Sequence, residues 1–449
     1  MRRWIAPALL IGSLVAACGG PRPWAHTMRP HPELANAVPM RARAVYRAMG
    51  LMVDTSRLSF VASLRFLAGP TPDSTLALFA LSLANRSLNF LPQGDDFVAQ
   101  YHVEITLHGD SGAAREAVQD ATVRVHSVQE THRMDESVIF QQLLAVRPGI
   151  GTVSVVVRDR NGPAYAAALN IVDTVPRLQG PALGRPIPIY QGAGRGRVAA
   201  MPQLVVNPRA TMLYWSDTLR MYVEGYGLPP GTRLAARVVD ADSVELWHDT
   251  LALKGEGSLA TAQFTIKPGE LPLGQAAFHV QVVGGPAQVE APFLVSFSDP
   301  WAVTKFDQMV DLLRYFSRQD LVAKLKAGPR DQRAVAWREF YKASDTVPTT
   351  TENETLKAYF QNLTAANRRF EELGGPGWKT DRGEVFLTLG EPAQAFEVPG
   401  KAGPGIRWEY PTLHVTLSFQ DDEGLGQYHL TPESRADYQH ALAQVRGTG

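Results

Sequence analysis

Between residues 58 and 297 the chain consists almost entirely of short segments in which apolar side chains alternate with polar or small ones. Tyr101, Val103 and Ile105, for example, fall on one face of the segment 97–107, which a turn at 109–112 follows. A period of two is typical of half-buried strands. Since no amphipathic helix of 10–15 residues intervenes, the pattern favours antiparallel β-sandwiches over a doubly wound parallel sheet.

A stretch rich in Pro and Gly, residues 176–196, divides the alternating region. We therefore expect two tandem β-sandwiches of immunoglobulin-like type, at 53–178 and 179–299. The stretch contains Gly192-Ala193-Gly194-Arg195-Gly196, which lacks the strand–loop–helix context of a nucleotide-binding loop. It is interpreted as part of a linker.

Near residue 300 the apolar period changes from two to that of an α-helix, with Val303, Phe306 and Val310 at helical spacing. Later strand patterns follow, and Val385, Leu387 and Leu389 are predicted to share one face of a strand. The predicted fold class is therefore multidomain and mainly β. It comprises two tandem immunoglobulin-like antiparallel β-sandwiches, a helical segment over 300–375, and a small C-terminal α/β module over 376–449.

Composition limits the possible functions. Lys plus Arg and Asp plus Glu both number 44, so the chain has no overall field that would attract nucleic acid. A single cysteine in 449 residues excludes an intramolecular disulfide, so stability has to come from hydrophobic cores. The 11 histidines show no metal-ligand spacing, and Asp240-Ala241-Asp242-Ser243 favours a turn over a calcium loop. We expect no metal, no cofactor and no nucleic-acid partner.

The cysteine lies where an export signal ends. Arg2 and Arg3 precede the apolar run 4–17, which is shorter than the ~20 residues of a membrane-spanning helix. Val15-Ala16-Ala17-Cys18 resembles the lipobox of bacterial lipoproteins. The resemblance implies that residues 1–17 are removed as a signal peptide and that the Cys18 thiol is lipidated. Residues 18–52 would then form a Pro-rich tether and a short helix.

Gly19, directly after the cysteine, resembles the outer-membrane sorting signal of bacterial lipoproteins. The predicted localisation is therefore the bacterial cell envelope, lipid-anchored and at the outer membrane, with the face left open. The predicted partners are the membrane, through the lipid at Cys18, and an envelope protein.

The most specific stretch is Gly377-Trp378-Lys379-Thr380-Asp381. Here the chain resembles the GWxTD-domain family, bacterial proteins that include many apparent lipoproteins and are generally described as of unknown function. The flanks at 366–370, 390–392, 408–410 and 426–430 resemble it too, and the likeness is strongest over about residues 300 to 432. It implies no catalytic residues. The positions that it singles out are Gly377, Trp378, Thr380, Asp381, Gly383, Gly390 and Pro392.

A structural interpretation of the motif is favoured. Gly377 would turn the chain at positive φ, and Trp378 would anchor a junction between helix and sheet. Thr380 and Asp381 would bond the backbone of a tight turn that Gly383 completes.

Two functional interpretations stay open for the same stretch. Lys379, Asp381, Arg382 and Glu384 would form a polar cluster in which two carboxylates act as acid and base. Alternatively, Trp378 would lie in a ligand or partner surface.

The sequence therefore predicts a non-enzymatic, lipid-anchored envelope scaffold with a protein partner. The alternatives are an envelope hydrolase using carboxylates near the motif, and a lipoprotein that binds glycans through exposed aromatic side chains.

Overall fold

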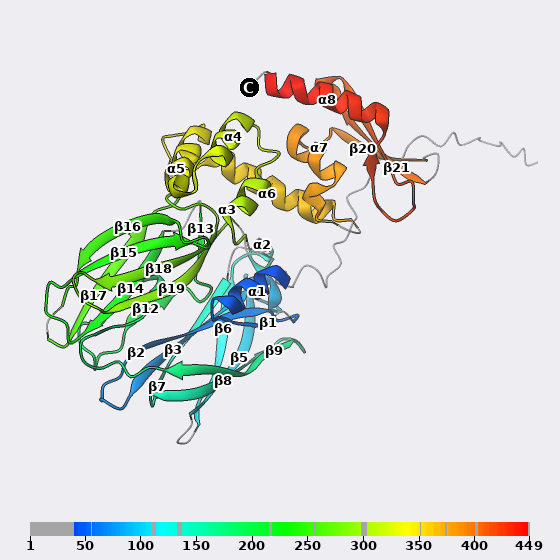
Figure 1. Ribbon diagram of the computed structural model, residues 1–449. Helices are drawn as coiled ribbons and strands as arrows, with labels where there is room; N and C mark the ends of the chain where they lie inside the picture. Colours follow the sequence, from blue (N-terminus) through cyan, green and yellow to red (C-terminus); the bar gives the residue numbers. More distant parts are fainter. Residues whose placement is uncertain are drawn as a thin grey trace, which may run out of the picture. The chain divides into compact units, whose positions relative to one another are not determined.

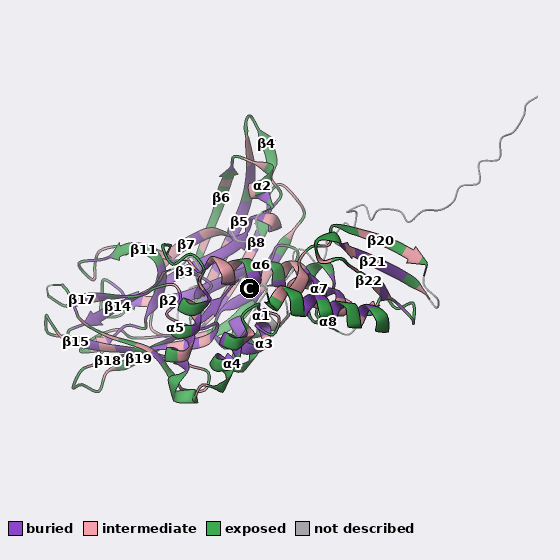
Figure 2. Ribbon diagram, turned by 90° about the horizontal axis from the view of Figure 1, so that it is seen from above, coloured by how far each residue is buried: buried purple, intermediate pink, exposed green. Residues whose placement is uncertain are grey.

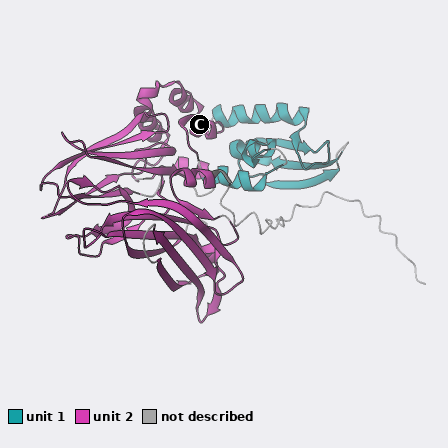
Figure 3. Cartoon of the chain, turned by 60° about the horizontal axis from the view of Figure 1, so that its bottom comes forward, with its two compact units in different colours: residues 1–28, 361–449 teal, residues 29–360 magenta. Residues whose placement is uncertain are grey.

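The computed structural model describes residues 40–54, 56–109, 114–132, 137–214, 218–255, 257–297, 303–350, 352–372, 375–399 and 403–447. Cys18 and the predicted signal peptide lie outside these residues, as does the tether up to residue 39. The described chain forms two compact units (Figures 1 and 3). The one called the first unit below ends at Phe360 and is magenta in Figure 3, and the one called the second unit begins at Gln361 and is teal. Among the described residues, no helix combines the length and apolar character that crossing a membrane requires.

The first unit opens with a short helix and a β-sandwich. Helix α1 (Met40–Ala48) packs on β1, and its Tyr46 is buried. Sheet 1 has the order β1 (Met52–Asp54), β2 (Phe60–Ala68), β3 (Thr75–Ala84) and β7 (Ser137–Val146). Sheet 2 contains β4 (Leu91–Gln93), β5 (Asp96–Gly109), β6 (Arg115–Val125), β8 (Gly149–Asp159) and β9 (Tyr165–Val175). A short helix, α2 (Val128–Thr131), precedes β7. All strand pairs in both sheets are antiparallel.

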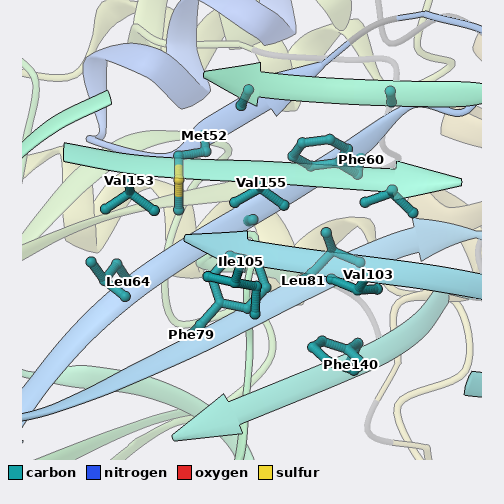
Figure 4. Packing of buried hydrophobic residues seen from close by; sticks show 14 of the residues in the cluster. Met52, Phe60, Leu64, Phe79, Leu81, Val103, Ile105, Phe140, Val153 and Val155 are labelled. Atoms are coloured by element: carbon teal, nitrogen blue, oxygen red, sulfur yellow. The ribbon is translucent and has the colours of Figure 1, made fainter. Parts of the chain in front are cut away.

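The alternating residues of the two sheets meet in one core. Phe60 and Phe79 of sheet 1 pack with Val103 and Val155 of sheet 2, and all four are at most 1% exposed (Figure 4). Inward-facing residues on alternating positions are the cause of the period of two in the sequence. The predicted first sandwich is present.

The second sandwich belongs to the same unit as the first. Sheet 3 contains β10 (Ala182–Leu183), β11 (Ile187–Gly194), β12 (Gln203–Val206), β14 (Leu219–Tyr226) and β17 (Leu259–Ile266). Sheet 4 has the order β13 (Thr211–Leu213), β19 (Gln288–Ser296), β18 (Gly274–Val282), β15 (Arg233–Asp240) and β16 (Glu245–Ala252). β13 pairs with β19 in parallel, and the other pairs are antiparallel. The predicted mainly β class, with two immunoglobulin-like sandwiches, is confirmed.

Sheet 1 is buried on both faces. Its second face carries Leu67, Leu76 and Leu78, which pack on Ile187 and Ile189 of sheet 3. Every residue of β3 is consequently buried, which explains why its sequence, TLALFALSLA, is apolar almost throughout. The two sandwiches are therefore stacked directly, and the linker predicted at 176–196 is wrong in part, because residues 187–194 form β11.

A buried ion pair within the second sandwich also bonds to the first sandwich. Arg195, expected in a linker, donates from Nε and Nη2 to the two carboxylate oxygens of Glu224 at 3.0 and 2.9 Å, and both side chains are 0% exposed. Arg195 Nη2 also donates to the carbonyl of Ala68 at the end of β2, 2.8 Å away. Tyr222 and Tyr226 donate their hydroxyls to the same carboxylate at 2.8 and 2.6 Å.

Burial, and then the neighbouring Glu224 carboxylate, raise the pKa of Tyr222 and Tyr226 above the ordinary tyrosine value. Both hydroxyls therefore stay protonated and keep donating. The Tyr226 oxygen in turn accepts the Ala68 N–H at 3.1 Å. The first sandwich is thus hydrogen-bonded to the second through a buried network that satisfies the Glu224 charge.

Helices α3 (Phe306–Leu312), α4 (Gln319–Ala327), α5 (Arg333–Ser344) and α6 (Glu354–Arg369) follow sheet 4. Arg333 of α5 donates to the carboxylates of Asp240 and Asp242 at 2.8 and 2.7 Å, and Trp337 donates its indole N–H to Gly269 at 3.1 Å. The Asp240–Ser243 turn therefore holds α5 on the second sandwich.

The second unit contains the small C-terminal α/β module. Its antiparallel sheet 5 has the order β20 (Gln394–Pro399), β21 (Pro404–Tyr410), β22 (Val415–Gln420) and β23 (His429–Leu430), and α8 (Pro432–Gly447) packs on β22. The strand predicted at 384–389 is wrong. Residues Asp381–Leu389 form helix α7. Rings of Phe370, Phe386, Trp408 and Phe419 lie 4.8 to 5.5 Å apart between these elements and form the core.

Candidate functional site

Residues 377–383 form the junction between α6 and α7, called the motif junction below. Gly377–Lys379 is a single 3₁₀ turn, η3, and Thr380 is the N-cap of α7. The predicted tight turn completed by Gly383 is wrong, since Gly383 lies in the first turn of the helix.

Both motif glycines are required by close approach of backbone. A Cβ on Gly377 would lie 2.6 Å from the carbonyl oxygen of Asn367 and the amide nitrogen of Glu371. A Cβ on Gly383 would lie 2.0 Å from the carbonyl oxygen of Gly377. The predicted positive φ at Gly377 is wrong, because its φ lies outside that region. The missing side chains, rather than an unusual conformation, let α6, η3 and α7 pack together.

The side chains of Trp378 and Thr380 also stabilise the junction. Trp378 is 3% exposed, and Lys379 Nζ lies 4.8 Å from the centroid of its ring. Thr380 Oγ1 accepts the Gly383 N–H at 3.1 Å and donates to the Gly377 carbonyl at 2.9 Å. One hydroxyl thus joins η3 to the start of α7.

Replacing Thr380 with alanine is expected to lower the free energy of unfolding of the second unit by about 1 kcal/mol, because the helix loses its N-cap. Thr380→Ser keeps the hydroxyl and serves as the control. Chemical denaturation followed by tryptophan fluorescence measures both variants. Equal losses in the two would contradict a capping role.

The two motif carboxylates are paired with groups from the end of the chain. Asp381 Oδ2 accepts the Leu430 N–H at 2.7 Å and a guanidinium N–H of Arg435 at 2.5 Å. Glu384 lies 3.6 Å from Arg435 and accepts the Tyr438 hydroxyl at 3.2 Å. The first turn of α7 is thereby tied to β23 and α8. The sequence predicts that Asp381 bonds the backbone of its own turn, and this prediction is wrong.

Arg382 forms a separate buried pair. Its Nη2 lies 2.7 Å from Glu372, and both side chains are 6% exposed. The guanidinium carbon lies 4.4 Å from the centroid of the Tyr428 ring. Arg382 thus connects the segment after α6 with the loop before β23, and its planar cation is held by a carboxylate and an aromatic face.

The remaining family positions lie after α7. Gly390 ends the helix at φ 85°, where a side chain would be strained, and its carbonyl accepts the Tyr410 hydroxyl at 3.0 Å. Pro392 lies in the loop between α7 and β20, next to Glu391, which pairs with Arg369. The structure therefore brings Gly377, Trp378, Thr380, Asp381 and Gly383 together, and places Gly390 and Pro392 at the opposite end of α7.

The charged side chains of the motif junction are engaged by partners, which limits the chemistry that they can perform. Sequence reasoning missed the partners Glu372, Arg435 and Tyr438, because nothing in the motif indicates which distant residues its charges meet. With those partners in place, the oxygens of Asp381 and Glu384 serve as hydrogen-bond acceptors inside the fold. Across the residues that the structure describes, no cluster of three or more His, Cys, Asp or Glu side chains is arranged to hold a metal.

Comparison with known proteins identifies the C-terminal part of the chain. A family model described as the GWxTD domain matches residues 286–444. The match begins just before β19, ahead of the boundary near 300 that the sequence predicts. No curated protein matches the chain.

Two solved structures show weak similarity. One is described as "Biofilm associated protein - BSP domain", with 10% identity, 56% of this chain and 54% of that chain covered, and a TM-score of 0.16. The other is a Bifidobacterium dentium β-glucuronidase complexed with coumarin-3-O-glucuronide, with 8% identity, 55% and 48% covered, and a TM-score of 0.18. The chain spans about half the length of each, and neither similarity carries an argument. The family match over 286–444 shows that this chain contains a GWxTD domain.

Proposed function

We propose that this protein is a non-enzymatic scaffold of the bacterial cell envelope, anchored to the outer membrane by lipid on Cys18. The observation that carries the proposal is which partners the motif residues bind. Asp381, Arg382 and Glu384 all bind partners within their own unit, so the most specific residues of the chain are engaged in holding the fold.

The stacked sandwiches support a scaffold role. Sheets 1 and 3 share an apolar core, and Arg195 and Tyr226 of the second sandwich each bond the Ala68 backbone of the first. Such an interface resists relative motion of the two sandwiches, as a spacer or assembly module requires. An envelope protein is the expected partner.

The export signal supports the anchor. Residues 1–17 and Cys18 have the order basic, apolar, small and cysteine. Bacterial lipoproteins normally carry more than one acyl chain, and more than one is needed for a stable hold.

Intact-mass and peptide mass spectrometry of the native protein tests the anchor. We expect the mature chain to begin at Cys18 with a diacylglycerol thioether and no residues from the leader. Cys18→Ser is expected to leave the leader uncleaved and the protein unlipidated. An unmodified Cys18 within an intact leader would refute the anchor.

Proximity cross-linking in cells tests the scaffold. We expect the same envelope protein to be recovered from independent preparations, and to be recovered equally by Glu384→Gln, which keeps an acceptor for Tyr438. Failure to recover any recurrent partner contradicts the scaffold. Turnover of envelope polysaccharide or peptide that Glu384→Gln abolishes without loss of folding would support the hydrolase instead.

A further inference from the structure

Exposed apolar side chains gather along one strand of the first sandwich. On β9, Tyr165, Leu169, Ile171 and Val172 are 63%, 57%, 41% and 69% exposed, and Ile150 on the adjacent strand β8 is 54% exposed. These five side chains, called the β9 patch, carry no formal charge. Large apolar groups that cluster in this way are characteristic of interaction surfaces.

Strand register places most of the patch on the outer face of sheet 2. Val153 is 1% exposed and faces the core, so its neighbour Thr152 faces outward. Thr152 pairs with Val172, and Ile150 pairs with Thr174, which puts Val172 and Ile150 on that outer face. The patch thus borders the side of the sandwich that no other sheet in the described unit covers.

A bulge makes this edge a poor template for another strand. The register of β8 and β9 shifts between Val153 and Val155, Asn170 has φ 53°, and the Asn170 N–H bonds Ser154 Oγ at 3.0 Å. Bulges on edge strands twist the edge away and terminate pairing. The patch is better suited to a fluid apolar surface than to an added β-strand.

The described chain begins beside this edge. Helix α1 packs on β1, and β1 lies against β9, where the Ala167 N–H bonds the Asp54 carboxylate at 3.2 Å. Met40 follows Cys18 by 22 residues (40 − 18). A chain of that length spans at most about 75 Å. A lipid on Cys18 would therefore hold the β9 edge within reach of the bilayer.

We propose that the β9 patch contacts the surface of the membrane to which Cys18 is attached, an inference that rests on the proposed lipid anchor. Tyrosine places an apolar ring and a polar hydroxyl at the interface, and the aliphatic side chains of the patch enter the boundary of the acyl region. The protein is thereby oriented on the bilayer by two contacts, the lipid and the patch.

The outer face of the same sheet is polar on β5 and towards the opposite edge, strand β6. His102, Glu104 and Asp120 of β5 and β6 form a polar network with Arg160, with contacts of 2.8 to 3.1 Å. Most residues of β6 are exposed (Figure 2). Its Val118 is 63% exposed, close to the 69% of Val172, and provides a matched control position.

Site-specific fluorescence tests the contact. In a Cys18→Ser background an introduced cysteine is the only thiol, so Val172→Cys or Val118→Cys can be labelled with an environment-sensitive nitrobenzoxadiazole dye. The mature-length chain, His-tagged at its N-terminus, is tethered to phosphatidylethanolamine–phosphatidylglycerol vesicles (3:1) through a nickel-chelating lipid. Equal thermal unfolding of both labelled variants confirms folding.

On tethering, we expect the dye at residue 172 to brighten severalfold, shift to the blue and be quenched by nitroxide-labelled lipids, while the dye at residue 118 does not change. Identical responses at the two positions would overturn the proposal. So would a response at residue 172 that requires added envelope protein, or one that grows with protein density, since these indicate a protein partner or a second copy. Because the tether is artificial, the result does not depend on whether Cys18 is lipidated in cells.

Discussion

Gly383→Ala is expected to destabilise the second unit by about 3 kcal/mol or more, the upper range for overpacking a closed site. The added Cβ would lie 2.0 Å from the Gly377 carbonyl oxygen and 2.9 Å from the Trp378 Cα. Both are backbone atoms, so no side-chain rotation can relieve the clash, and α7 has to move away from η3. Urea unfolding followed by intrinsic tryptophan fluorescence, to which Trp378 and Trp408 contribute, measures the loss.

Gly375→Ala is the matched control for Gly383→Ala. Gly375 lies two residues before the motif, has no positive φ, and a Cβ there would meet no atom within 4 Å. We expect this variant to change the free energy of unfolding by no more than about 0.5 kcal/mol. If Gly383→Ala were as stable as Gly375→Ala, the close packing of η3 and α7 would be refuted.

Arg195→Met is expected to lower the free energy of unfolding of the first unit by about 3–5 kcal/mol. The substitution leaves the Glu224 carboxylate at 0% exposure without its cation and removes the bond to the Ala68 carbonyl. Two tyrosine hydroxyls remain as donors, but they cannot neutralise the charge. Thermal and chemical unfolding of the whole chain measures the loss of free energy. Hydrogen exchange of residues 60–80 and 187–226 shows whether the loss lies at the interface of the two sandwiches.

Two comparisons define the contribution of this pair. Arg195→Met with Glu224→Leu is expected to lose less than Arg195→Met alone, because no lone charge stays buried. Arg318→Ala removes an ion pair with Asp320 whose side chains are 52% and 54% exposed, and should cost less than about 1 kcal/mol. A loss at Arg195 no larger than at Arg318 would contradict the buried network.

The sandwiches could be predicted from sequence because most strands outside sheet 1 bury one face, which produces alternation. Their direct stacking was missed, although β3 carries a signal of it. Leu76, Ala77, Leu78 and Phe79 are apolar on consecutive positions, as a strand buried on both faces requires. The Pro and Gly residues of 176–196 suggested a linker, yet five of the eight residues of β11 precede its first glycine, and Ile187 and Ile189 among them pack against sheet 1.

Helix α7 was mistaken for a strand because Val385, Leu387 and Leu389 alternate. The signals of a helix were also present. Thr380 is a favoured N-cap, and Gly390 at φ 85° is a typical C-terminal stop. The prediction assigned Thr380 to a turn, and the periodic signal of a nine-residue helix was too short to correct it.

The position of the candidate site could be predicted from sequence, but the side-chain contacts within it could not. The motif itself indicates where backbone packs closely, since Gly377 directly precedes Trp378 and Gly383 follows within the next five residues. The pairing of Asp381 with Arg435 across 54 residues, and of Arg195 with Glu224 across 29, depends on tertiary structure that no local pattern encodes.

Amide hydrogen exchange on intact protein, with and without Asp381→Ala, tests most directly whether the motif junction holds the second unit together. In the native protein the amides of Gly383 and Leu430 should exchange at the slow rate of the sheet 5 core. In Asp381→Ala, loss of the acceptor leaves the Leu430 N–H unsatisfied, and exchange should accelerate by about tenfold or more throughout residues 377–442. Acceleration confined to residues next to 381, with the core of sheet 5 unchanged, would contradict the structural role of the motif.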